Sequence, residues 1–317
     1  MVCKLFIILL VFVSCVSVPP VDERPSGGGV ASIEAVQPVW RPFAREATGG
    51  LAYLEGKVTR PRLEFYALRV DISNPELEIV VAGGGRTGGK AEGVDGGSSL
   101  SVKVSTFVRE NNLLAGINAL PFDTSSAVEG EPRVNIGLVI SGGVMISPPH
   151  PVYDALIFYT GGGAVIIAQS ETGSDVNTTQ PVAPPAAVSI ENAVGGFRRI
   201  LENGKPVERV ADLNIRHPRS AVGISSDGRF LYLLVIDGRR PGSIGATEKE
   251  TALLLLAFGA SEGINFDGGG SSALALRFPD GKIRTVNTPV HGGIPGRERA
   301  VAGCLGVGIK TGNQYQH

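Results

Sequence analysis

The chain has 317 residues, enough for one large domain or two small ones. Its 29 Lys and Arg residues nearly balance its 30 Asp and Glu residues, which argues against nucleic acid or an anionic membrane surface as the main partner. Hydrophobic residues make up 43% of the sequence, so a substantial core can form. The 44 Gly and 21 Pro residues indicate short strands joined by tight turns and argue against a helical bundle.

The N-terminus has the pattern of an export signal. Residues 1–4 carry one positive charge, and residues 5–13 form an apolar run too short to anchor a helix across a bilayer. The residues ending at Cys15 resemble a bacterial lipobox with Phe where Leu is usual, so Cys15 is a lipidation candidate; the alternative is ordinary signal peptidase cleavage after Cys15 or Ser17. We therefore expect residues 1–15 to be a signal peptide. The protein would be exported to the bacterial cell envelope or secreted, with membrane contact only through such a lipid anchor.

The sequence gives no sign of a metal site or of a cofactor. Cys3 and Cys15 fall in the signal region and leave only Cys304, which argues against an internal disulfide or a cysteine metal cluster. The four histidines show no spacing typical of a zinc site. We expect no metal and no cofactor.

The organisation along the chain predicts one folded domain after a tether. Residues 16–45 contain Pro, Ser and Gly without apolar periodicity and indicate a linker, so the domain would span residues 46–313. Many strands and few helices favour an α+β fold, a single β-rich domain with a mixed sheet and a few helices packed on it. The predicted helices are 101–112 and 247–258; the predicted strands include 63–72, 77–81, 114–118, 137–140, 155–159, 164–168, 221–225 and 230–236.

One strand–helix–strand unit brings two carboxylates into the same region. A strand ends before Asp237, a helix with Thr247 as N-cap follows, and a second strand leads to Asp267. If the two strands are parallel neighbours, both aspartates emerge at the same edge of the sheet, where ligands bind in many α/β folds. Glu250 lies three residues after Thr247, which is the spacing of a capping box.

A glycine-rich turn directly follows Asp267. Its residues are Gly268, Gly269, Gly270, Ser271 and Ser272. Glycines allow positive φ or a close approach of the backbone, and successive N–H groups in such a turn can bind an anion. A carboxylate beside an anion nest indicates a functional site rather than a stabilising device.

Several motifs, in this order along the chain, resemble the phosphodiester glycosidase family, to which the lysosomal uncovering enzyme belongs. They are RSAVGI at 219–224, DGR at 237–239, GAT at 245–247 with Glu250, and NFDGGGSS at 265–272. The resemblance covers roughly residues 50–311. Further positions similar to the family are Asn118, Asn287 before Thr-Pro, and Arg297 and Arg299 before the last apolar strand. After Asn118 the family usually has Gly and an aromatic pair, whereas Ala119 and Leu120 follow here. This difference would change the wall of the pocket, and so the identity of the substrate more than the type of reaction.

The resemblance implies hydrolysis of the bond between a sugar's anomeric carbon and a phosphate oxygen in a glycan phosphodiester. A glycosidase normally uses two carboxyl groups. Because a phosphomonoester is a good leaving group, its developing negative charge needs more help than its protonation, and arginine provides that help. Asp267 would be the base or nucleophile, with Asp237 second as acid, base or sugar-hydroxyl ligand and Glu250 a third carboxylate. The substrate-binding candidates are Arg239 and Arg219 for the phosphate, and Asn118, Gly268, Gly269, Gly270, Ser271, Ser272, Asn287 and Arg297.

Each of these residues has a structural alternative. Glu250 would only cap its helix, Asp237 would sit in a plain turn, Arg219 would pair with a carboxylate, and Asp267 would bind a structural cation or hold the glycine turn. His217 and His291 are further candidates for lining the pocket. The alternative for the whole protein is a non-catalytic carbohydrate-binding protein of the cell envelope on the same fold.

Overall fold

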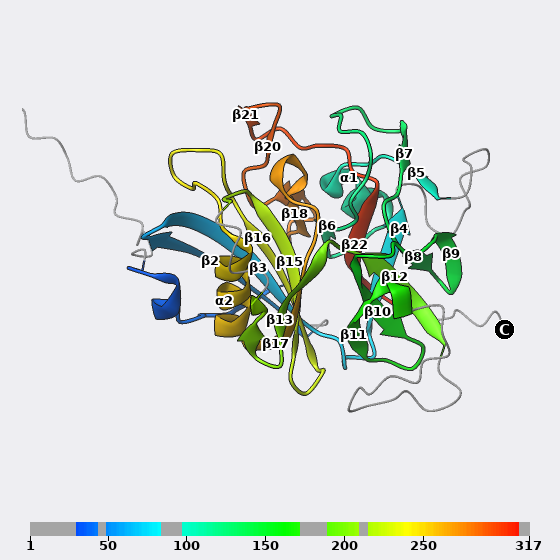
Figure 1. Cartoon of the computed structure of the whole chain (residues 1–317), viewed down its shortest axis with the longest axis horizontal. Coiled ribbons are helices and arrows are strands. Elements are labelled where there is room, and N and C mark those ends of the chain that lie inside the picture. The colour runs from blue at the N-terminus through cyan, green and yellow to red at the C-terminus, as the bar shows by residue number, and fades with distance from the viewer. Residues whose placement is uncertain (1–29, 44–48, 84–96, 172–188, 209–214, 311–317) are drawn as a thin grey trace, which may run out of the picture.

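A computed structural model describes residues 30–43, 49–83, 97–171, 189–208 and 215–310 of the chain (Figure 1). The signal region therefore lies outside the described residues, and its assignment stays a prediction. None of the described helices is both long and apolar enough to cross a membrane.

An eight-stranded antiparallel sheet is the largest element of the fold. Glycine and proline punctuate its sequence into short strands, as composition predicts. Its strand order is β1 (Arg41–Pro42), β2 (Leu51–Thr59), β3 (Arg62–Asp71), β16 (Phe230–Ile236), β15 (Arg219–Ser225), β17 (Ala260–Asn265), β13 (Arg198–Glu202) and β14 (Lys205–Pro206).

Two five-stranded antiparallel sheets complete the domain, with two small two-stranded ladders. The first has the order β11 (Ala164–Ala168), β10 (Asp154–Tyr159), β12 (Ile190–Gly195), β8 (Val139–Ser141) and β9 (Val144–Ser147). The second has the order β19 (Ile283–Thr285), β18 (Leu274–Arg277), β6 (Ala115–Asn118), β22 (Gly303–Ile309) and β4 (Leu77–Gly83). The ladders join β20 (Val290–His291) to β21 (Ile294–Pro295) and β5 (Ser98–Leu100) to β7 (Pro132–Val134).

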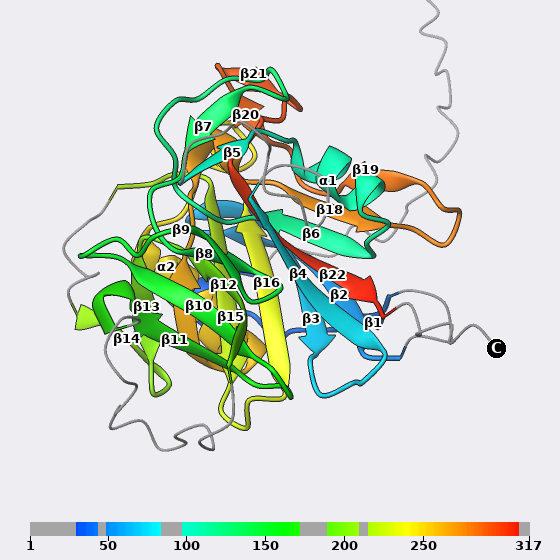
Figure 2. The ribbon, with the colours of Figure 1, turned by 90° about the vertical axis from the view of Figure 1, so that its right-hand side faces the viewer.

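Both faces of the eight-stranded sheet are covered. Figure 1 shows α2 (Glu248–Phe258) on one side and the two five-stranded sheets on the other, and Figure 2 looks onto these two sheets. The larger apolar cluster lies between the sheets and includes Leu233 and Val222 of the eight-stranded sheet with Leu156 and Leu305 of the two five-stranded sheets. The second cluster lies under α2. Burial on both faces explains why β15 and β16 read as nearly continuous apolar runs without alternation.

The clearest predicted helix forms with the predicted ends. The side chain of Thr247 accepts a hydrogen bond from the backbone N–H of Glu250, and the Glu250 side chain accepts one from the Thr247 N–H, so the capping box is complete. Gly259 ends the helix with a φ of 105°, in the left-handed region that glycine tolerates. The other predicted helix is shorter than expected: α1 spans Val104–Glu110.

Two expectations about the architecture are wrong. The predicted mixed sheet is antiparallel in every ladder of the described strands, because β15 lies between β16 and β17 and pairs antiparallel with both. β16 and β17 therefore run parallel to each other without being neighbours. The predicted tether is also too long, because residues 30–43 belong to the fold: Ile33 and Val36 are buried in the cluster under α2, and the Trp40 ring lies against Phe258.

Candidate functional site

The functional candidates gather where β16 and β17 end and β15 begins. Since β16 and β17 run in the same direction, the segments that follow them meet at one edge of the sheet, as the sequence predicts. The meeting is very close: a Cβ on Gly245, whose φ is 91°, would lie 2.6 Å from the backbone carbon of His217. A Cβ on Gly268 would lie 2.7 Å from the carbonyl oxygen of Pro218. Only glycine permits these backbone approaches.

Asp267 is held in place through its backbone and retains a partly buried carboxyl group. Its N–H donates to the carbonyl of Ala119 at 2.8 Å, and its own carbonyl accepts from the Nδ2 of Asn118 at 2.6 Å. The Ser271 hydroxyl donates to Oδ2 at 2.5 Å. Burial raises the pKa of Asp267 to about 6, against the opposing effects of the Ser271 hydrogen bond and of the nearby Arg299 charge. A carboxyl group that titrates this close to neutrality is typical of catalytic sites.

Two arginines approach the glycine turn after Asp267. Arg239 has a φ of 60°, which is strained for a residue with a side chain, and its Nη2 would lie 2.8 Å from a Cβ on Gly269. Arg239 is exposed, and its side chain forms no hydrogen bond or ion pair with another described residue. The Nη2 of Arg299 would lie 2.6 Å from a Cβ on Gly270. Both glycines therefore make room for a guanidinium group.

Arg299 connects Asp267 to the β20–β21 hairpin. Its Nη1 donates to the Oγ of Ser271 at 3.1 Å, and its Nε donates to the Nδ1 of His291 at 3.2 Å. The pKa of Arg299 is lowered by burial, while the charge of Asp267 opposes this shift. Arg297 is exposed, and its charge helps to lower the pKa of His291. Two guanidinium groups, those of Arg299 and Arg239, therefore act on the Asp267 carboxyl group through their charge.

The glycine turn is less open than the predicted anion nest. It contains a short 3-10 helix, η5 (Gly269–Ser271). The N–H of Gly269 donates to Pro218, and those of Ser271 and Ser272 donate to carbonyls within the turn. Because these three N–H groups already have partners, the arginine side chains are the stronger candidates for binding an anion here.

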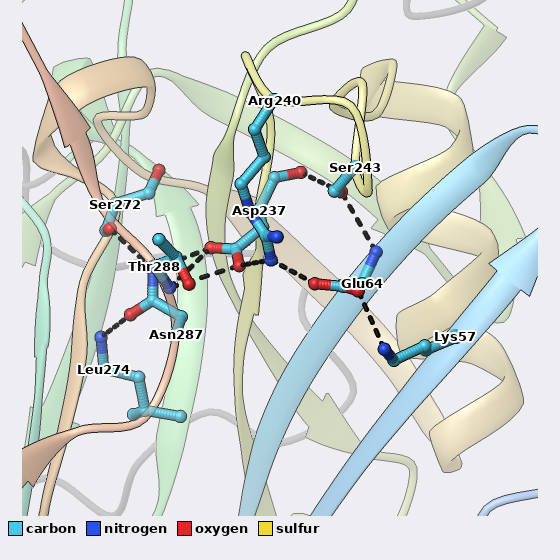
Figure 3. A network of polar contacts seen from close by, with 9 residues as sticks. All are labelled: Lys57, Glu64, Asp237, Arg240, Ser243, Ser272, Leu274, Asn287 and Thr288. Atoms are coloured by element: carbon cyan, nitrogen blue, oxygen red, sulfur yellow. Dashed lines mark hydrogen bonds and ion pairs between the residues drawn. The ribbon is translucent and has the colours of Figure 1, made fainter. Parts of the chain in front are cut away.

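Asp237 lies at the same edge, in a closed network of polar contacts (Figure 3). Its carboxylate accepts from Arg240 Nη2 at 2.6 Å, from Asn287 Nδ2 at 3.0 Å, and from the N–H of Thr288 at 3.0 and 3.1 Å. Arg240 also pairs with Glu64. The Asp237 residue is 1% exposed, and burial raises its pKa, while these partners oppose the shift. Both carboxylate oxygens are thus occupied by protein groups.

Asn287 and Asn118, two of the predicted substrate-binding residues, form hydrogen bonds with other protein groups instead. The Asn287 amide donates to Asp237 and to the carbonyl of Ser272 and accepts from the N–H of Leu274. Asn118 is fully buried and accepts from the Ser220 hydroxyl at 2.6 Å as well as holding Asp267. These two asparagines position the turn after Asp267.

Arg219 is also engaged by protein groups. Its guanidinium group donates to the carbonyls of Ala246 and Ile215, at 3.0 and 2.9 Å, and lies 3.5 Å from Glu248. The side chain is mostly buried, and burial lowers its pKa. Arg219 therefore fastens the start of β15 to the first turn of α2.

Glu250 lies in α2 with both of its oxygens occupied. Besides closing the capping box, it accepts two hydrogen bonds from Arg216, at 2.7 and 2.5 Å. This arrangement stabilises the start of the helix and leaves no oxygen free for a substrate.

We expect Glu250→Ala to destabilise the protein without abolishing any activity of the site. Loss of one side of the capping box and of the Arg216 pair should lower the free energy of unfolding by about 1–2 kcal/mol, while kcat/KM stays within about twofold. Urea unfolding and initial rates measure the two effects. Glu110→Ala, at the exposed end of α1, is the control for removal of a surface carboxylate. A large loss of turnover at unchanged stability would restore Glu250 as a catalytic candidate.

The sequence identifies Arg299 by its place before the last apolar strand and His291 as a candidate for lining the pocket. The structure brings both together, because Arg299 donates to His291 and to Ser271, the partner of Asp267. Within the described part of the chain, no group of three His, Cys, Asp or Glu side chains lies close enough to hold a metal ion.

Comparisons with known proteins identify the family and similar folds. The family model described as phosphodiester glycosidase matches residues 111–308, more than half of the chain. The zebrafish N-acetylglucosamine-1-phosphodiester alpha-N-acetylglucosaminidase catalytic domain, solved in a form auto-inhibited by its pro-peptide, superposes with a TM-score of 0.59 at 17% identity, over 89% of this chain and 87% of that one. A hypothetical protein from Synechocystis gives a TM-score of 0.56 at 14% identity, over 86% and 64% of the two chains. At these identities the likeness concerns the fold.

A curated relative is also similar in sequence. The SPbeta prophage-derived uncharacterized protein YomE of Bacillus subtilis is 27% identical over 212 residues, which are 64% of this chain. The chain spans only 29% of the length of that relative.

Proposed function

The chain belongs to the phosphodiester glycosidase family, and we propose that it is an exported hydrolase that cleaves a sugar-1-phosphodiester into a sugar and a phosphomonoester. Water would supply the hydroxyl group to the anomeric carbon, and the phosphate would leave with the electron pair of the broken bond. Export rests on the N-terminal sequence pattern.

A single observation carries this proposal: one carboxyl group with a pKa near neutrality lies among arginines. Asp267 titrates at about 6, and Arg299 and Arg239 both lower its pKa through their charge. A glycosidase with an alcohol leaving group needs a second carboxyl group as acid, whereas a phosphate leaves as an anion and needs cations instead. The other two predicted carboxylates, Asp237 and Glu250, are bound to arginines within the protein.

The proposed roles follow from these partners. Ionised Asp267 would act on the anomeric carbon as nucleophile or as the base that takes a proton from water. Arg239, exposed and without a side-chain partner among the described residues, would bind the phosphate, together with Arg299. Asp237, Asn118 and Asn287 would hold the surrounding loops and would not touch the substrate.

The test is a panel of sugar-1-phosphodiesters that differ in the sugar and in its anomer. The proposal predicts that the mature protein releases a phosphomonoester and a reducing sugar from at least one of them. Calorimetric binding of the same compounds without release of product would favour the alternative, a carbohydrate-binding envelope protein on this fold.

The rate should depend on pH through Asp267. The raised pKa means that the carboxyl group is protonated below about 6 and ionised above it. Since both proposed roles need the ionised form, kcat/KM should fall about tenfold per pH unit below this value and level off above it. A profile of kcat/KM from pH 4 to 8 measures the effect. A rate that rises as the pH falls through 6 would instead assign Asp267 as a general acid.

A further inference from the structure

A relay of hydrogen bonds leads from the β20–β21 hairpin to Asp267. His291 lies at the end of β20, at the same end of the molecule as the segments that follow β16 and β17 (Figure 1). Its Nδ1 accepts from the Nε of Arg299 at 3.2 Å. The Nη1 of Arg299 donates to the Oγ of Ser271 at 3.1 Å, and that oxygen donates to Oδ2 of Asp267 at 2.5 Å.

The chemistry of arginine fixes the direction of this relay. A guanidinium group has five donors and no acceptor, so both of its partners must accept. Nδ1 of His291 therefore carries no proton, and a neutral imidazole has its proton on Nε2. Because Oγ of Ser271 accepts from Arg299, the only hydroxyl proton of Ser271 points to Asp267.

We infer that His291 is a positioning residue of this site: as a neutral imidazole it holds the Arg299 guanidinium against Ser271 and beside Asp267. The relay occupies Oδ2 of Asp267, so Oδ1, which Ser271 does not touch, is the oxygen that would face the anomeric carbon or water. This last consequence rests on the proposed function, whereas the proton positions on His291 and Ser271 do not.

The surroundings of His291 keep the imidazole neutral. Burial lowers its pKa most, and the charges of Arg299, Arg297 and Arg239 lower it further. These three arginines come from the loop after β16 and from the segment after β21, and no carboxylate among the described residues pairs with His291. Protonation would also place an N–H of the imidazole against the Nε–H of Arg299.

The relay has a measurable effect on Asp267. The charge of Arg299 lowers the pKa of this carboxyl group and so opposes the raising effect of burial. Without an acceptor at position 291, Arg299 would lose one of its two anchors and move more freely. The pKa of Asp267 should then rise, because burial remains and part of the opposing charge is lost.

The experiment uses the whole mature protein without substrate. Nuclear magnetic resonance of ¹⁵N-labelled imidazoles reports the proton positions on His291, and ¹³C chemical shifts report the titration of Asp267. His291→Asn keeps an oxygen near the place of Nδ1, and His291→Ala has no acceptor. We expect an unprotonated Nδ1 in the natural protein, an Asp267 pKa higher by about 0.5–1 unit in His291→Ala, and an unchanged pKa in His291→Asn. His150→Ala, which removes a histidine stacked on Tyr153, is the matched control.

Two results would overturn the inference: a proton on Nδ1 of His291, or an Asp267 titration that is the same in His291→Ala as in the natural protein. If His291→Ala fails to fold, the imidazole spectrum of the natural protein and the titration of His291→Asn still decide. Where turnover is found, the acidic limb of kcat/KM should shift with the Asp267 pKa. Absence of turnover in the natural protein would contradict the proposed function. The imidazole spectra and the Asp267 titration would still test the relay, because they need no substrate.

Discussion

Asp267→Asn should lower kcat/KM for a sugar-1-phosphodiester at least about 10³-fold, because in the proposed reaction it removes the group that acts on the anomeric carbon. The amide keeps the shape of the side chain, and its oxygen can still accept the hydrogen bond that Ser271 donates at 2.5 Å. The loss should therefore appear in kcat, while KM changes little because Arg239 and Arg299 remain. Steady-state kinetics on the best substrate of the panel measures both values.

The same substitution should make the protein more stable at neutral pH. Burial raises the pKa of Asp267 from 3.8 to about 6, so its carboxyl group contributes stability only in the protonated form, and this contribution is lost as the pH rises through 6. The amide carries no such penalty. After a discount for partial exposure, Asp267→Asn should gain about 1–2 kcal/mol at pH 8 relative to pH 4. Urea unfolding at both pH values measures this difference.

The matched control is Asp280→Asn, an exposed aspartate in the turn between β18 and β19 that pairs with Arg284. We expect it to leave both the rate and the pH dependence of stability unchanged within error. Full turnover in Asp267→Asn would remove Asp267 from the reaction. A loss of both rate and stability at pH 8 would make it a structural residue that holds the glycine turn.

The sequence predicts the core of this site through strand direction. The apolar runs before Asp237 and Asp267, with a capped helix between them, correctly place both aspartates at one edge of the sheet. Local periodicity and caps carry that information. They do not show that β15 lies between β16 and β17. The pairing of β15 with β17 joins residues more than 30 positions apart in the sequence, which local patterns do not record.

Partners that are distant in sequence could not be predicted in the same way. Arg240 follows Asp237 by three residues, yet its other partner, Glu64, lies on β3. His291 reaches Ser271 only through Arg299, and the hairpin that carries it has no strong local signal. Trp40 lies in a Pro- and Ser-rich stretch that reads as a linker, but its ring packs on Phe258 and Tyr232. Such contacts depend on the packing of the whole fold.

Asp237→Ala should have the largest effect on stability, because it breaks a buried network. The residue is 1% exposed, and its carboxylate accepts from Arg240, Asn287 and the N–H of Thr288. Removal leaves the N–H of Thr288 without an acceptor, while Asn287 keeps the carbonyl of Ser272 and Arg240 keeps only Glu64. Losing one partner of a buried ion pair typically costs 3–5 kcal/mol, and Arg240 is partly exposed, so we expect a loss of about 2–4 kcal/mol.

Asp71→Ala provides the matched control for this prediction. Asp71 pairs with Arg229 through two hydrogen bonds, at 3.0 and 2.7 Å, where the hairpin of β15 and β16 turns, far from Asp267 along β16. The Arg229 side chain is 54% exposed, so water replaces the lost partner, and we expect a loss of about 1–2 kcal/mol with unchanged kcat/KM.

The network also joins Asp237 to the reaction. Asn287 links it to the carbonyl of Ser272, and Thr288 leads directly into the hairpin of His291. Asp237→Ala should therefore lower kcat/KM about 10–100-fold even under conditions where the variant is fully folded, by displacing both supports of Asp267. A double-mutant cycle with Arg240→Met separates the effects on stability and on rate. Stability should recover in part, since Arg240 no longer has to be buried with only Glu64 as its partner, while the rate should not recover. Recovery of the rate together with stability would show that Asp237 acts only through folding, and a rate loss as large as that of Asp267→Asn would show that it takes part in the chemistry.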